Sequence, residues 1–86
     1  MKNVADAVVD RLCKYMGEKE LTQYKLAQDS GVPFATLKSI MQRRTRDISL
    51  KTVIMLAYGL SLSASEFLDD QSFSFGGLKL NNLDID

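Results

Sequence analysis

The sequence predicts an all-α domain, a five-helix bundle that contains a helix-turn-helix unit and ends in a short C-terminal arm or β-hairpin. Apolar residues recur at three- and four-residue spacing along residues 3–68, as amphipathic helices require. Five Gly and one Pro in 86 residues indicate short turns between the helices. Residues 1–70 are assigned to one domain and residues 71–86 to a tail, because this length leaves no room for a second domain.

The first helix is predicted over residues 3–16. Its apolar stripe comprises Val4, Ala5, Val8, Val9, Leu12, Cys13, Tyr15 and Met16. Cys13 is therefore expected to pack as a small apolar residue and not to act as a redox sensor. Gly17 is expected to end the helix, because glycine is common just beyond helix C-termini.

Residues 21–40, LTQYKLAQDSGVPFATLKSI, have the pattern of two short helices joined by a glycine turn. Thr22 caps the first of them, although Lys25 stands where a complete capping box has Glu. Gly31 supplies the positive φ of the turn, and Pro33 begins a second helix over residues 33–42. The inward face of this second helix comprises Val32, Leu37, Ile40 and Met41. The outward face comprises Phe34, Ala35, Thr36, Lys38, Ser39 and Gln42.

Two more helices are predicted after a polar basic loop at residues 43–47, RRTRD. Ser49 caps the first of these, the central core helix. Its expected core residues are Leu50, Val53, Leu56, Ala57 and Leu60. A capping box over residues 63–66, flanked by a Leu62–Phe67 hydrophobic staple, begins a short helix over residues 64–69.

The tail has a different pattern. Residues 72–75 and 78–80 alternate apolar and polar residues around Gly76-Gly77, a favoured two-residue hairpin turn. A small hairpin and a loosely ordered tail both fit this pattern. The tail is rich in large apolar residues, namely Phe73, Phe75, Leu78, Leu80, Leu83 and Ile85. We expect apolar contacts to order it and to support a homodimer.

Charge is unevenly distributed along a chain whose formal net charge is zero. Residues 1–68 have ten Lys/Arg and seven Asp/Glu, whereas residues 69–86 have one Lys and four Asp. Between residues 38 and 51, five basic residues stand against Asp47 alone. Because local charge governs contact with phosphate, this segment favours nucleic acid.

Several other functions find no support in the sequence. It has no histidine, no catalytic pair at a recognisable spacing and no phosphate-binding glycine loop, so an enzyme is not expected. One cysteine without histidine provides no ordinary zinc site, and no cofactor is expected. No apolar run approaches the roughly 20 residues that cross a bilayer. A free thiol and the lack of an export signal indicate the cytoplasm.

The segment from about Val9 to Leu68 resembles the Cro/cI-type (XRE-like) helix-turn-helix domains of bacterial and phage regulators. The order and spacing of short matches carry the resemblance: Leu21-Thr22-Gln23, Leu26-Ala27, Gly31-Val32, Thr36-Leu37 with Ile40, Ser49-Leu50, Leu56-Ala57 with Leu60, Leu62-Ser63 and Glu66-Phe67-Leu68. The resemblance implies a lambda repressor-like bundle that binds double-stranded operator DNA, usually as a homodimer, and regulates transcription.

The resemblance also implies two sets of DNA contacts. The positions that read bases are Phe34, Ala35, Thr36, Lys38 and Ser39. The positions that touch phosphate are Gln23, Gln42, Arg43, Arg44 and Arg46. Phe34 and Ala35 offer no hydrogen bonds, although apolar side chains can contact thymine methyl groups. Sequence specificity would then depend on the polar neighbours and on DNA shape.

The chain departs from the family pattern at two turns. Met41 to Arg44 replace the frequent Glu-x-Gly after the recognition helix, so this loop must turn without glycine. Ser61 replaces the usual glycine at the end of the fourth helix.

The sequence therefore predicts a sequence-specific transcriptional regulator of bacterial, phage or mobile-element origin, with helix 33–42 in the DNA major groove. The competing hypothesis is a protein-interaction module of antitoxin or anti-repressor type that keeps the fold but binds DNA weakly or not at all. Phe34, the neutral total charge and the acidic, apolar tail favour this alternative, with Phe34 or the tail contacting the partner protein.

Overall fold

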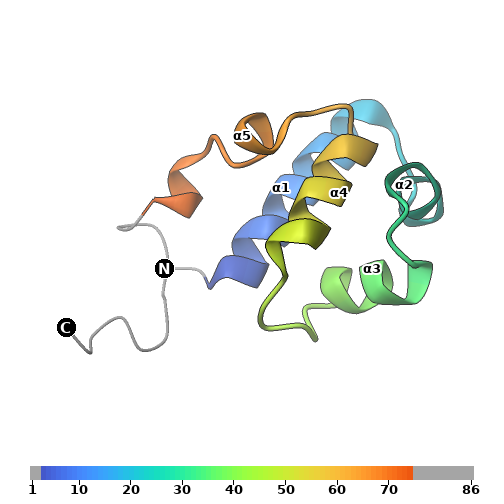
Figure 1. Ribbon diagram of the computed structural model, residues 1–86, viewed down its shortest axis with the longest axis horizontal. Helices are drawn as coiled ribbons and strands as arrows, with labels where there is room; N and C mark the ends of the chain where they lie inside the picture. Colours follow the sequence, from blue (N-terminus) through green and yellow to red (C-terminus); the bar gives the residue numbers. More distant parts are fainter. Residues whose placement is uncertain (1–2, 75–86) are drawn as a thin grey trace.

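The computed structural model describes residues 3–74, and the regular secondary structure of these residues is all helical. The elements are α1 (Val4–Lys19), α2 (Gln23–Ser30), α3 (Phe34–Met41), α4 (Leu50–Gly59), α5 (Ala64–Phe67) and a 3-10 turn, η1 (Gln71–Phe73). Figure 1 shows α2 and α3 together on one side of the bundle and η1 on the other. α4 packs against α2 and α5, and α1 contacts α3 and η1. The predicted five-helix bundle is confirmed.

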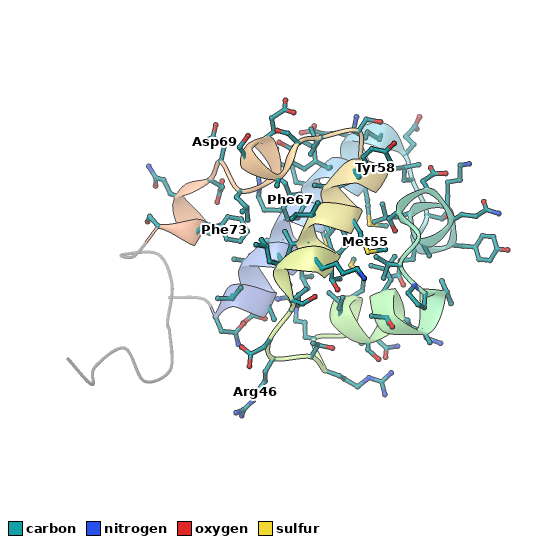
Figure 2. All side chains as sticks on the ribbon, viewed as in Figure 1. Arg46, Met55, Tyr58, Phe67, Asp69 and Phe73 are labelled. Carbon is teal, nitrogen blue, oxygen red and sulfur yellow. The ribbon has the colours of Figure 1, made fainter. Side chains whose placement is uncertain are left out.

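One core unites the five helices, because each contributes a fully buried apolar side chain. These are Leu12 of α1, Leu26 of α2, Leu37 of α3, Leu56 of α4 and Phe67 of α5. Figure 2 shows Phe67 lying against the centre of the bundle. Burial of each such side chain contributes about 1.5–3 kcal/mol to folding. The core therefore fixes the position of α3 relative to the other helices.

Three helix starts follow the prediction. The hydroxyls of Thr22 and Ser49 each accept a hydrogen bond from the N–H three residues later, at 3.1 Å. Ser63 and Glu66 form a complete capping box, in which Ser63 N–H donates to Glu66 Oε1 at 2.9 Å. Hydrogen bonds from the backbone and side chain of Ser63 lower the pKa of Glu66. α3 has no side-chain cap and begins directly after Pro33.

Three helices end on a non-glycine residue with positive φ. Glu20, Arg43 and Ser61 have φ values of 54°, 61° and 62°, respectively, whereas α2 ends on Gly31 with φ 81°. After each of the three, the next residue's N–H donates to a carbonyl five residues back, as in a Schellman motif. The two turns where family glycines are replaced therefore keep the left-handed backbone, at a cost of roughly 1–2 kcal/mol per residue.

Three expectations about helix ends and faces are wrong. Gly17 does not end α1, which continues to Lys19 and has its left-handed residue at Glu20. Cys13 is exposed because a helix turns about 100° per residue, which carries it past the edge of the stripe that contains Leu12. Leu50 is also exposed, because it is the first residue of α4 and lies beyond the core.

The start of the tail is a helical turn and not the first strand of the hairpin, which was one of the two alternatives left open by the sequence. Residues 71–73 form the 3-10 turn η1, and the helix predicted over residues 64–69 is limited to Ala64–Phe67. Phe73 is half-buried and its ring centroid lies 6.4 Å from that of Phe67. Apolar contact therefore orders the beginning of the tail. The predicted turn at Gly76-Gly77 and the second strand lie outside the described residues.

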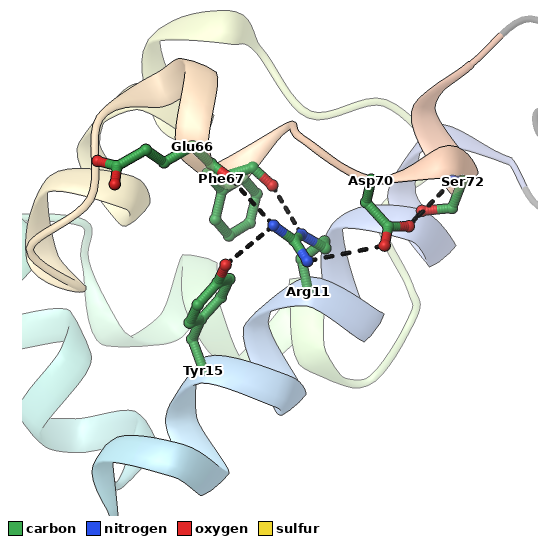
Figure 3. A network of polar contacts seen from close by, with 6 residues as sticks. All are labelled: Arg11, Tyr15, Glu66, Phe67, Asp70 and Ser72. Carbon is green, nitrogen blue, oxygen red and sulfur yellow. Dashed lines mark hydrogen bonds and ion pairs between the residues drawn. The ribbon is translucent and has the colours of Figure 1, made fainter.

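A buried arginine joins the first helix, α1, to α5 near the C-terminal end of the described chain, as Figure 3 shows. Arg11 of α1 is only 5% exposed. Its guanidinium donates to the carbonyl oxygens of Phe67 at 2.7 Å and Glu66 at 2.9 Å, and to the Tyr15 hydroxyl at 3.0 Å. It also lies 3.7 Å from a carboxylate oxygen of Asp70. The last carbonyls of α5, which lack partners within the helix, are thus bound by α1.

Replacing Arg11 should destabilise the bundle strongly. Arg11→Met keeps the aliphatic bulk but leaves the buried Phe67 carbonyl without its side-chain donor, and leaves the Glu66 carbonyl with Asp69 N–H alone. We therefore expect the free energy of unfolding to fall by about 2–4 kcal/mol. Urea denaturation measures the change. Lys14→Met, an exposed position on the same helix, is the control and should cost less than about 1 kcal/mol. Equal stability of the two variants would contradict the role given to Arg11.

Substitution by alanine should change the free energy of unfolding in opposite directions at Gly59 and Gly17. A Cβ at Gly59 would lie 2.7 Å from Cβ and 2.9 Å from Cα of Ser30, where α4 approaches the end of α2. Gly59→Ala should therefore lower the free energy of unfolding by about 1–3 kcal/mol. Gly17→Ala, with no atom within 4 Å of the new Cβ, should raise it by about 0.5–1 kcal/mol. Thermal unfolding compares them, and a stabilising Gly59→Ala would contradict the close approach.

Candidate nucleic-acid interface

Hydrogen bonds of two consecutive backbone N–H groups, those of Gly31 and Val32, stabilise the turn between α2 and α3. Gly31 adopts the required positive φ, and its N–H donates to the Ala27 carbonyl at 3.0 Å. The buried Ser30 hydroxyl accepts a hydrogen bond from Val32 N–H at 3.2 Å. Val32 itself is buried in the core. These contacts fix the direction in which α3 leaves the turn.

α3 has one buried face and one exposed face, as predicted. Leu37 and Ile40 are buried in the core, and Met41 is partly buried against it. On the opposite face, five of the predicted residues are exposed and Ser39 is half-buried; the exposed ones are Phe34, Ala35, Thr36, Lys38 and Gln42. The positions expected to read bases thus lie together on the accessible side of one helix.

Two arginines of the loop after α3 are available for an external anion. Arg44 and Arg46 are exposed and have no ion-pair partner within residues 3–74. Figure 2 shows Arg46 pointing away from the bundle on the side where the loop lies below α3 and α4. Gln42 is the exposed C-cap of α3, and Gln23 is the half-buried first residue of α2.

Arg43 has carboxylate partners within the bundle. Its guanidinium donates to Asp6 at 2.7 Å and to Asp10 at 3.2 Å, both on α1. The hydrogen bond to Asp6, followed by that to Asp10, raises the pKa of Arg43. The pair therefore fastens the basic loop to α1. This contact was not predicted, because no sequence pattern marks partners more than thirty residues apart.

Sequence analysis also missed an aromatic contact at this surface. Tyr24, the second residue of α2, has its ring centroid 5.9 Å from that of Phe34, the first residue of α3. The two rings are inclined by 58°. Both remain substantially exposed, at 65% for Tyr24 and 42% for Phe34. Phe34 is thus an exposed aromatic residue with a neighbour from the preceding helix.

Residues 3–74 contain neither a cluster of metal ligands nor a membrane-spanning helix. No group of three or more acidic, cysteine or histidine side chains is close enough to hold a metal ion there. None of the helices in that range combines the length and apolarity needed to cross a bilayer.

A glycine turn that joins two short helices, with the second exposed beside a basic loop, defines a helix-turn-helix DNA-binding domain. Residues 11–72 match the family model described as the Cro/C1-type HTH DNA-binding domain. Because the match covers well over half of the chain, the chain belongs to this family. This confirms the resemblance found in the sequence, and such domains are typically not enzymes. No curated protein matches the chain.

Proposed function

We propose that this chain is a sequence-specific transcriptional regulator of bacterial, phage or mobile-element type that acts in the cytoplasm. The proposal rests on the accessible face of α3 next to Arg44 and Arg46, two exposed arginines without an ion-pair partner in the described chain. Exposed cations beside a helix of suitable size for the major groove are the features that duplex DNA requires.

In the proposed complex, α3 lies in the major groove. Phe34, Ala35, Thr36, Lys38 and Ser39 face the base edges. Gln23 at the start of α2, Gln42 at the end of α3, and the arginines of the loop contact phosphates. In the free protein, Arg43 holds the loop in place for Arg44 and Arg46 through its ion pairs with α1. In the complex it exchanges these carboxylate partners for a phosphate and joins the phosphate contacts.

The phosphate contacts should govern the salt dependence of binding. Each contact with duplex DNA contributes about −0.9 to the slope of log K against log salt. Arg44→Ala with Arg46→Ala should therefore weaken binding to every duplex and flatten the slope by about 1.8. Fluorescence titration at several salt concentrations measures both quantities.

A matched control removes the same charge elsewhere. Lys14→Ala with Lys19→Ala changes two exposed lysines of α1 and should leave the slope nearly unchanged. An unaltered slope in the arginine variant would remove the loop from the phosphate contacts.

The alternative is a protein-interaction module of antitoxin or anti-repressor type on the same fold. The exposed aromatic rings of Tyr24 and Phe34 favour it, because such a patch also suits a protein partner. The same titration separates the two functions. A DNA reader should bind a random duplex at about 50 mM salt with a dissociation constant of roughly 10⁻⁴–10⁻⁶ M or tighter. Absence of binding there supports the alternative.

We also propose that two copies bind DNA as a homodimer, with half-sites about 34 Å apart. Besides the tail, α4 offers an exposed apolar stripe at four-residue spacing. Leu50, Ile54 and Tyr58 are 65%, 46% and 77% exposed, respectively. Surface of this kind is commonly covered by another protein molecule.

Two variants distinguish the tail from α4 as the dimer contact. Truncation after Ser74 removes the apolar residues beyond η1 but keeps Phe73, and Ile54→Lys places a charge in the centre of the stripe. Sedimentation should show a dimer that becomes monomeric with one of these changes. A monomeric wild type at micromolar concentration, or a dimer that survives both changes, would contradict the proposed contacts. Thermal melting checks that each variant is folded.

A further inference from the structure

The contact between Tyr24 and Phe34 is not explained by the folding of the bundle. Neither ring belongs to the core cluster or to the partly buried residues packed against it. Two exposed aromatic residues on a small domain leave apolar area in water, and each covers the other only in part. The pair stands at the first turns of both helices of the helix-turn-helix unit, where α3 begins its accessible face.

The start of α3 carries apolar side chains at positions where most bases would be read by hydrogen-bonding residues. Phe34 and the adjacent Ala35 have no side-chain donor or acceptor, so neither can recognise guanine or adenine by paired hydrogen bonds. In the major groove, the apolar group that distinguishes one base pair from the others is the C5-methyl of thymine. An exposed phenyl ring is a suitable surface for that methyl group.

Tyr24 limits the movement of the phenyl ring. Its contact comes from a different helix, and the turn between the two helices is itself fixed by Gly31 and Ser30. A side chain that is already held in place loses less conformational entropy when it binds. Tyr24 is thus a positioning residue that acts through Phe34.

We propose that Phe34, held by Tyr24, reads thymine through its C5-methyl group, so that this chain prefers duplexes with thymine at the position facing the start of α3. This inference rests on the proposed DNA-binding function and specifies the base that it recognises.

The test uses two synthetic duplexes of equal length, one of alternating A·T pairs and one of alternating A·U pairs. Uracil lacks the C5-methyl but keeps the hydrogen-bonding groups and the phosphates. The wild-type chain should bind the thymine duplex about threefold to fivefold more tightly, as expected for covering one methyl-sized group. The salt slopes on the two duplexes should be equal, because the phosphate contacts are the same.

Four variants assign the preference to the aromatic pair. Phe34→Ala should bind both duplexes equally, and Tyr24→Ala should reduce the preference. Tyr24→Phe, which keeps the ring, should retain it. Gln28→Ala changes an exposed residue of α2 outside the aromatic pair and should retain it too. Equal binding of both duplexes by the wild type, or an undiminished preference in Phe34→Ala, overturns the inference.

The result also separates this inference from the proposed function. If the wild type binds both duplexes equally and with a normal salt slope, the thymine preference fails while DNA binding stands. If it binds neither duplex, the proposed function fails and the inference fails with it. Because the base change is made on the DNA, the comparison does not depend on the folding of any variant.

Discussion

The buried guanidinium of Arg11 is the contact that holds α5 against α1, and the packing of the bundle depends on it. Burying a charge is costly unless every donor finds a partner. Here the partners are the terminal carbonyls of α5, a four-residue helix too short to be stable alone. The arginine therefore makes these hydrogen bonds only if α5 lies against α1. The same contact provides donors for the last carbonyl groups of α5. Phe67 is buried in the core as a consequence.

From that core the position of the DNA-binding elements follows in steps. Leu37 and Ile40 fasten α3 to the bundle, so its opposite face must be accessible. At Gly59, α4 comes so close to Ser30 that no side chain fits between them, which places the end of α2 and hence the turn. Arg43 then fastens the loop to α1 through two ion pairs. These exposed pairs are individually weak, but together they restrict a loop that has no glycine.

Local signals account for what the sequence could predict. The caps at Thr22, Ser49 and Ser63 and the turn at Gly31 depend on neighbours within four residues, and all four were predicted correctly. The wrong expectations at Gly17, Cys13 and Leu50 concern the exact end of a helix and the edge of its apolar face, which apolar spacing alone does not define. α1 continues past Gly17 to Lys19 and has its left-handed residue at Glu20. Residues 71–73 form η1, with Phe73 packed on Phe67, where the sequence had left a hairpin and a loosely ordered tail open. Arg11 and Tyr24 were missed because their partners lie on other helices.

The ion pairs of Arg43 also reduce the number of basic residues between positions 38 and 51 that are free to contact DNA. With Arg43 bound to two carboxylates of α1, four cations of this segment lack ion-pair partners in the described chain, namely Lys38, Arg44, Arg46 and Lys51. Even if all four contacted phosphate, including Lys38 and Lys51, the salt slope would be only roughly −3.6, below that of a protein with about 6–10 phosphate contacts. In the proposed complex, one copy would therefore supply about half of these phosphate contacts. Two copies related by twofold symmetry would reach that range without any further basic residue, so the charge distribution itself favours binding to a two-part site.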